Sequence, residues 1–185
     1  MAKLILQDVR CSYVFITEPR KNKDGTDGSY GVQVLIPKTN KKMLQQIQNA
    51  VKEVAKEKFP KVKKLGSLKL PLRDGDEEGE GEHLEGHYFM NANSNRKVGI
   101  VNRQGDSPDQ ADLDEYCFSG AYFHCSINLF GFDTDGNKGV AVGLNNVMLR
   151  KKGPRLDGMV SAESEFSDFA DDGEGDEDFD DLDDL

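Results

Sequence analysis

Residues 120–130 read Gly-Ala-Tyr-Phe-His-Cys-Ser-Ile-Asn-Leu-Phe, and their strict alternation decides the fold. One side of this stretch is apolar throughout and consists of Ala121, Phe123, Cys125, Ile127 and Leu129. The other side mixes polar groups with rings and consists of Tyr122, His124, Ser126, Asn128 and Phe130. A period of two is that of a half-buried β-strand. We therefore expect the first set in a core and the second set outside it.

A turn and a returning strand follow. Residues 133–137 read Asp-Thr-Asp-Gly-Asn, which is typical of a hairpin turn, and Val140, Val142 and Leu144 then alternate in a strand that runs to Leu149. A calcium loop of the EF-hand type would need Gly at its sixth position and Glu at its twelfth. Lys138 and Leu144 occupy those positions, so the turn interpretation is favoured.

Further strands are expected over residues 3–17, 29–36, 86–93 and 97–101. Residues 43–55 form one apolar stripe at helical spacing, with Thr39 or Asn40 as the N-cap and Pro60 as the stop. Residues 61–73 are predicted to be irregular, 74–85 a turn or mobile loop, and 104–114 an acidic loop. The pattern predicts a mainly β fold: a small closed barrel of five or six strands with one capping helix.

Charge divides the chain into a basic body and an acidic end. The net charge is −10, yet residues 161–185 hold 13 acidic residues and no basic one, which leaves +3 for residues 1–160. Residues 1–73 alone carry +10. We expect one domain over 1–160 and a disordered acidic tail over 161–185, because the tail has too few apolar residues to bury a core. A basic body suggests a polyanionic partner, although lysines that only maintain solubility would give the same charge.

Several classes of protein are disfavoured. No apolar run is long enough for a membrane span, and the N-terminus lacks a signal-peptide pattern, so a cytoplasmic location is expected. The three cysteines, Cys11, Cys117 and Cys125, are expected to be buried and reduced. No nucleotide-binding, hydrolase or metal-ligand motif is present. We therefore expect no enzymatic activity, no cofactor and no metal.

Outward-facing rings are the strongest indication of a binding site. Rings that face water can be covered by other parts of the chain, or can stack on nucleic-acid bases while neighbouring cations bind phosphates. The second interpretation gives a candidate nucleic-acid site composed of Tyr13, Phe15, Lys69, Arg73, Asn91, Arg96, Lys97, Arg103, Tyr122, His124, Phe130, Lys138 and Arg150. In the tail, Phe166, Phe169, Phe179 and Leu185 are candidates for partner binding.

The chain resembles a family of bacteriophage single-stranded DNA-binding proteins that was first described as a domain of unknown function. The resemblance lies in Val9 to Pro19 and in residues 30–37, 86–92, 120–132 and 136–147, which occur in the family's order and spacing. It implies an oligonucleotide-binding (OB)-fold-like barrel that coats single strands during phage replication, without catalysis. The plan is also similar to phage replication proteins whose acidic tail ends in an aromatic residue, whereas this chain ends in Leu185.

The leading hypothesis is a sequence-tolerant coat of single-stranded DNA for phage replication or recombination. Its acidic tail would compete for the DNA groove and bind replication proteins such as a polymerase or helicase. One alternative is an acidic DNA mimic that blocks a host DNA-binding protein, which the basic N-terminal half disfavours. A metal-dependent nuclease is the other alternative, for which the sequence offers no ligand cluster.

Overall fold

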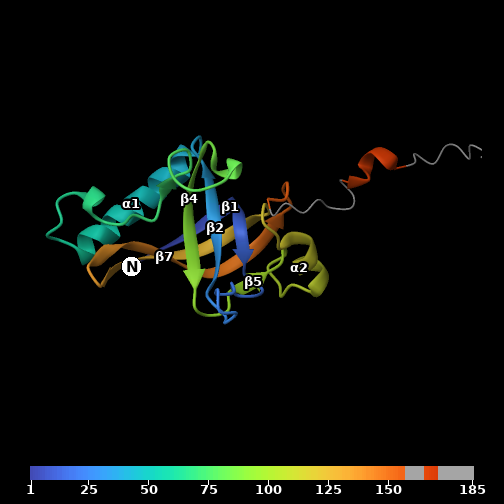
Figure 1. The fold of residues 1–185 in the computed structure, drawn as a ribbon, viewed down its shortest axis with the longest axis horizontal. Helices are drawn as coiled ribbons and strands as arrows, with labels where there is room; N and C mark the ends of the chain where they lie inside the picture. Colours follow the sequence, from blue (N-terminus) through green and yellow to red (C-terminus); the bar gives the residue numbers. More distant parts are fainter. Residues whose placement is uncertain (157–164, 171–185) are drawn as a thin grey trace, which may run out of the picture.

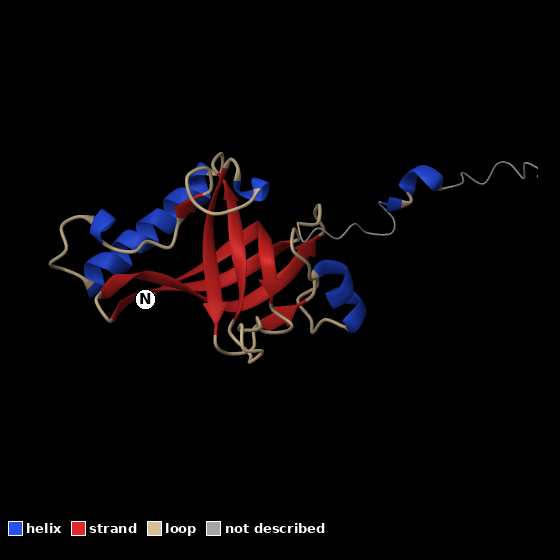
Figure 2. Cartoon of the chain, in the orientation of Figure 1, coloured by secondary structure: helices blue, strands red, loops and turns tan. Residues whose placement is uncertain are grey.

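The computed structural model describes residues 1–156 and 165–170 (Figure 1). In this part of the chain the long strands are β1 (Ala2–Phe15), β2 (Tyr30–Pro37), β4 (His87–Ser94), β6 (Tyr122–Thr134) and β7 (Asn137–Lys151). They pair in the order β4-β2-β1-β6-β7, and a parallel pairing of Asn93 on β4 with Gly143 on β7 closes the ring. The predicted β-barrel is confirmed, and Figure 2 shows its crossing strands. The short strands β3 (Arg73–Asp74) and β5 (Gly99–Val101) extend it beside β4 and β7.

The alternation of residues 120–130 has the predicted outcome. Ala121, Phe123, Cys125, Ile127 and Leu129 are fully buried, whereas Phe130 on the outer face is 39% exposed. Asp135 and Gly136 form the two-residue turn between β6 and β7, and both have positive φ, as a type I′ hairpin turn requires. This hairpin is the longest pairing in the barrel.

Helix α1 (Lys41–Lys58) caps one end of the barrel, as predicted, and packs against β6, β1 and β7. The side chain of Asn40 accepts a hydrogen bond from the amide of Met43, so Asn40 is the N-cap. The apolar stripe buries Leu44, Ile47, Val51 and Val54 among others. In Figure 1, α1 lies at the opposite end of the barrel from α2 and the end of β7.

The prediction of an acidic loop over residues 104–114 is wrong in part, because helix α2 (Gln110–Tyr116) begins within this range. Asp109 and Asp112 form a capping box in which each side chain accepts a hydrogen bond from the backbone N–H of the other residue. This pair stabilises a seven-residue helix that is too short for helical periodicity to be recognised. The described part of the chain thus contains two α-helices, rather than the single helix predicted.

The segment predicted to be a turn or mobile loop, residues 74–85, packs on the outer face of β2 and β4. Its 3₁₀ turn η2 (Glu82–Leu84) buries Leu84 against Leu35 and Phe89. Lys38 bridges the carboxylates of Asp74 and Asp76, at 2.7 and 2.6 Å. The pKa values of both carboxyl groups are lowered, chiefly by the hydrogen bond from Lys38. An ordered acidic segment therefore borders this side of the barrel.

Residues 61–73, predicted to be irregular, contain only the short 3₁₀ turn η1 (Leu65–Ser67) before β3.

The thiols of Cys11 and Cys125 are buried in the core, with their Sγ atoms 4.0 Å apart, as expected for reduced cysteines. Cys117 is only half-buried, contrary to the prediction.

No helix in the described ranges is long and apolar enough to span a membrane. Near the C-terminus the structure describes a 3₁₀ turn, η3 (Ser167–Phe169), within the predicted tail. Residues 157–164 and 171–185, with most of the expected disorder, lie outside the described residues.

Candidate nucleic-acid interface

A polar row crosses the outer face of three neighbouring strands. Ser12 on β1 lies opposite Gln33 on β2, and Gln33 lies opposite Asn91 on β4. The hydroxyl of Ser12 donates to Oε1 of Gln33, and both side chains are buried, whereas Asn91 is exposed. Neighbouring strands are about 4.8 Å apart, so the row covers about 10 Å perpendicular to the strands. We call this row, with the clusters at its two ends, the β1–β2–β4 face.

The first end of the face is an aromatic cavity of about 350 Å³. Tyr13 is 52% exposed there, and its ring stands edge-on to His83 at a centroid distance of 6.2 Å. Phe15 is half-buried and also lines the cavity, with the guanidinium of Arg20 lying 5.3 Å from its ring centre. Tyr13 and Asp8 have positive φ beside the two register shifts of β1. Such bulges redirect side chains, and here one turns the Tyr13 ring to the surface.

His83 joins this end to the middle of the row. Its Nε2 lies 3.2 Å from the same Oε1 of Gln33 that accepts from Ser12. The pKa of His83 is lowered, first by desolvation and then by the positive charges of Arg10 and His87. His83 is therefore mostly neutral at pH 7, and its half-buried ring links Tyr13 to Gln33.

The second end of the face is a cavity of about 190 Å³ next to the β6–β7 hairpin. Lys69 and Arg73 line it together with Asn91, Asn93 and Phe132. The backbone of Lys69 is bound to β7, since its amide donates to Lys138 O and its carbonyl accepts from Val140 N, both at 2.9 Å. A Cβ at Gly139 would lie 2.2 Å from the Lys69 carbonyl oxygen, so only glycine permits this approach.

Phe130 and Lys138 extend this end along the hairpin. Phe130 lies opposite Ala141, which lines the cavity, and its ring faces Gly143. The ammonium of Lys138 lies 3.8 Å from Asp133, an exposed pair that contributes little to stability. No ion pair of the described residues involves Lys69 or Arg73, and both are exposed. Rings, amides and two cations without an ion pair among the described residues, Lys69 and Arg73, thus lie together here.

Three of the predicted residues lie on a different surface, formed by β6 and β7. The ammonium of Lys151 lies 4.5 Å from the ring centre of Tyr122. Nδ1 of His124 accepts from the amide of Asp8 at 2.9 Å, and Nε of Arg150 donates to the Asp8 carboxylate at 3.2 Å. We call this the β6–β7 face. Its polar groups are already bound to one another.

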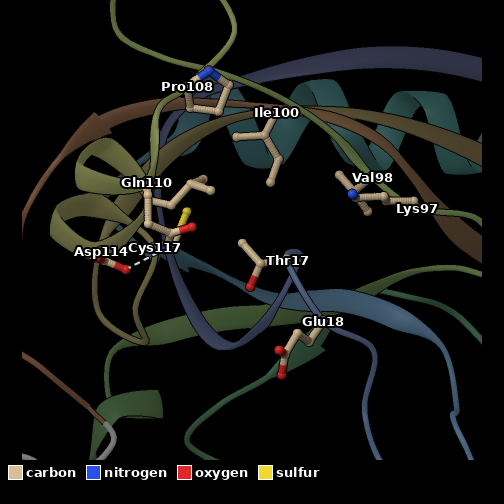
Figure 3. Close-up of a pocket in the computed structure, with 10 residues that line it drawn as sticks. Thr17, Glu18, Lys97, Val98, Ile100, Pro108, Gln110, Asp114 and Cys117 are labelled. Carbon is tan, nitrogen blue, oxygen red and sulfur yellow. Dashed lines mark hydrogen bonds between the residues drawn. The ribbon is translucent and has the colours of Figure 1, made fainter.

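Arg96, Lys97 and Arg103 lie apart from both faces, on the loops around β5. Lys97 lines a cavity of about 700 Å³ between the start of the β1–β2 loop, β5 and α2 (Figure 3). Glu18 and Asp114 also line it, and Asp114 accepts a hydrogen bond from Gln110. Burial raises the pKa of Cys117 in this cavity to about 12, so its thiol is not an activated nucleophile.

Five residues at these two ends were not predicted from the sequence: Ser12, Gln33, His83, Asn93 and Phe132. Asn93 and Phe132 fall on the outward phase of their strands and could have been found by alternation, whereas the others needed the strand register or the fold of the 75–86 segment. Among the described residues, no three His, Cys, Asp or Glu side chains are grouped as metal ligands. Phe166 and Phe169 are 60% and 79% exposed, and Phe179 and Leu185 lie outside the described residues.

Comparison with known proteins places this architecture in a family. A family model described as "Enterobacter phage Enc34, ssDNA-binding protein" matches residues 2–179. "Putative protein p50" of Acyrthosiphon pisum secondary endosymbiont phage 1 is 27% identical over 164 residues, which cover 84% of this chain and 87% of that protein.

Solved structures share the fold. The single-stranded DNA-binding protein of bacteriophage Enc34, solved in complex with ssDNA, superposes with a TM-score of 0.69 at 19% identity, over 83% of this chain and 89% of that chain. The gp2.5 protein of bacteriophage T7, a single-stranded DNA-binding protein, superposes with a TM-score of 0.53 at 16% identity, over 93% and 97%. At these identities the likeness establishes the fold, which confirms the predicted OB-like barrel.

Proposed function

The chain belongs to the Enc34 phage family of single-stranded DNA-binding proteins, and on that premise we propose that it binds single-stranded DNA across the β1–β2–β4 face. In OB folds, oligonucleotides bind over the second and third strands of the barrel and the loops that border them. Those strands are β2 and β4 here. The observation that carries the proposal is that exposed rings and cations lie at both ends of this face, with Tyr13 at one end and Lys69 and Arg73 at the other.

Each kind of side chain has a separate task in this proposal. Tyr13 at one end and Phe130 and Phe132 at the other present rings on which bases stack, at about 1–3 kcal/mol per base. Lys69, Arg73 and Lys138 bind phosphates. Because every base has a ring face and every nucleotide a phosphate, binding tolerates any sequence. The protein acts by covering the strand, without catalysis, in phage replication or recombination.

The acidic residues 161–185 form a separate tail in the proposal, attached to a DNA-binding domain over residues 1–160. A tethered polyanion has an effective concentration on the order of millimolar near its own body. It therefore competes with DNA for the cations of the β1–β2–β4 face. DNA releases the tail, whose phenylalanines then become available to replication proteins such as a polymerase or helicase.

Incubation of labelled single strands with the protein and magnesium tests the proposal. We expect a mobility shift without cleavage and a much weaker shift with duplex. The log–log slope of affinity against salt should be about −0.7 for each phosphate bound. A slope near zero, equal affinity for duplex, or degradation of the strand would reject it.

A comparison of the full chain with a variant that lacks residues 161–185 tests the role of the tail. At low salt the truncated protein should bind oligo-dT more tightly, because its net charge changes from −10 to +3. The gain should shrink as the screening length falls to about 8 Å near physiological ionic strength. Equal affinities at low salt would leave the tail without a competing role.

A further inference from the structure

An apolar pocket of about 270 Å³ lies on the outside of the barrel, between α1 and the 65–72 segment. Its walls are Val51 of α1, Leu65, Leu70, Leu72 and the ring of Tyr88. A cavity of about 150 Å³ with similar apolar walls binds a benzene molecule in another protein. The pocket therefore has room for a phenyl ring.

The rim of this pocket is positively charged. Lys52 lines it, and the exposed Lys63 and Lys64 immediately precede Leu65. None of the ion pairs within the described residues involves these three lysines. An apolar pocket beside uncompensated ammonium groups matches a ligand that combines an aromatic ring with carboxylates.

The chain itself carries such a ligand. Phe166 precedes the turn η3 and Phe169 ends it, and they are 60% and 79% exposed, the two largest exposed fractions among the aromatic side chains described. The ten residues 163–172, Glu-Ser-Glu-Phe-Ser-Asp-Phe-Ala-Asp-Asp, contain five carboxylates and no cation. Exposed pairs of large rings are unfavourable in water unless a partner covers them.

The pocket and the turn belong to opposite ends of the proposed DNA path. Leu70 and Pro71 line both the apolar pocket and the cavity at the Arg73 end of the β1–β2–β4 face. Leu156, which leads into the tail, lines the cavity at the Tyr13 end. When copies follow one another on a strand in the same orientation, the Tyr13 end of one faces the Arg73 end of the next.

The length of the linker between the barrel and the turn η3 also favours docking on a neighbouring copy. Lys69 is bridged to Gly139 near the start of β7, and Lys151 at its end is 12 residues further on, at most about 40 Å along this curved strand. The ten residues from Leu156 to Phe166 span at most about 36 Å when fully extended. Docking in the same molecule would therefore use much of the linker's reach, whereas a following copy brings its own pocket to the Tyr13 end.

We propose that the Phe166–Phe169 turn of one copy docks in the pocket between α1 and residues 65–72 of the next copy on the strand. The proposal rests on the proposed function, and it names the partner that receives the released tail. The contact is heterologous, head to tail, so it propagates along DNA and makes binding cooperative.

A labelled peptide of residues 163–172 tests the pocket directly. It is titrated into the full-length Phe166→Ala/Phe169→Ala protein, which keeps the pocket but lacks its own rings. We expect saturable binding that weakens on the order of tenfold when Lys52→Glu/Lys64→Glu is added, because two attractions become repulsions. Lys41→Glu/Lys42→Glu, at the other end of the same helix, is the matched control and should leave peptide binding nearly unchanged. Equal peptide affinity for the Lys52/Lys64 variant and the control would overturn the proposal.

Cooperativity on DNA tests the contact between copies. Affinity is measured for an oligo-dT that holds one copy and for a long poly-dT. Both Phe166→Ala/Phe169→Ala and Lys52→Glu/Lys64→Glu should lose on the order of tenfold in apparent affinity for poly-dT beyond any change on the short strand. Unchanged cooperativity, even with peptide binding, would overturn docking between copies. Failure of the unmodified protein to bind any single strand would instead reject the proposed function.

Discussion

The β1–β2–β4 face and the β6–β7 face look alike in the sequence and differ in the structure. Both are built from outward positions of alternating strands, and both carry rings, amides and cations. On the β6–β7 face these groups are paired, with Tyr122 under Lys151 and the Asp8 carboxylate beside Arg150. On the β1–β2–β4 face, Lys69 and Arg73 form no ion pair with described residues, and Tyr13 is half exposed.

This difference shows that outward orientation alone does not make a nucleic-acid site. A cation already bound to a carboxylate must lose that partner before it binds phosphate, and part of the gain is then lost. A cation exposed only to water and ions releases counterions when phosphate binds. We therefore expect DNA affinity to depend on the first face much more than on the second.

The largest effect is expected in the core that supports both faces. Phe123→Ala should lower the free energy of unfolding by about 3–5 kcal/mol, because Phe123 is fully buried. Chemical denaturation measures it, with the outward Tyr122→Ala as the matched control from the neighbouring position. A larger loss for Tyr122→Ala than for Phe123→Ala would mean that the inner and outer faces of β6 are reversed.

Removing one ring from each face tests which of the two faces binds DNA. Phe130→Ala should cost about 1–3 kcal/mol in oligo-dT affinity if the ring stacks on one base. Tyr122→Ala should cost less, since Lys151 already covers its ring. Fluorescence titration of both variants measures the two losses. Equal losses of affinity for the two variants would instead support the prediction from the sequence that both Tyr122 and Phe130 stack on bases.

Cations on the two faces should differ in salt dependence. Lys69→Ala/Arg73→Ala removes two phosphate contacts, so the log–log salt slope should become less negative by about 1.4. Arg150→Ala/Lys151→Ala removes the same formal charge from the other face and should change the slope less. An equal change of slope in the two double variants would contradict the proposed difference between the two faces.

The smallest effect is expected from pH. The pKa of His83 is lowered by desolvation, so the unfolded chain binds a proton more readily than the folded one near pH 6. Without DNA, stability should therefore fall as pH drops below the ordinary histidine pKa of about 6.5. Nearby phosphates favour the protonated ring, so DNA affinity should rise modestly over the same range.

His83→Gln should remove that pH-dependent gain in affinity. His124→Gln is the control, because the pKa of His124 is also lowered by desolvation but this residue lies on the β6–β7 face. Titrations of oligo-dT at pH 8 and pH 6 give both values. If the gain in affinity persisted in His83→Gln and disappeared in His124→Gln, the DNA would lie on the β6–β7 face, contrary to the proposal.

Much of the fold could be predicted because local patterns determine it. The alternation of residues 120–130, the Asp-Gly turn and the apolar stripe of α1 each specify one element, and each prediction is confirmed. Helix α2 could not be predicted, because a capping pair rather than periodicity stabilises it. The packing of Leu84 on Leu35 and Phe89 was equally hidden, since it depends on contacts distant in sequence.

The candidate site was predictable only in its residue types. Lys69, Arg73 and Asn91 are brought together by the pairing of Lys69 with β7 and of Arg73 with β4, which no local pattern encodes. Tyr122 and His124 have the same outward phase as Phe130, yet cross-strand partners occupy them. Ser12 and Gln33 carry no signal by themselves and join the site through strand register.

Photo-crosslinking to an oligonucleotide that contains 5-iodouracil tests the central claim most directly. The full-length protein is irradiated with the bound strand, and the modified residues are identified by mass spectrometry. We predict crosslinks to Tyr13 and to Phe130 or Phe132, at the two ends of the β1–β2–β4 face. Crosslinks at Tyr122 and His124, with none at those three rings, would contradict the account.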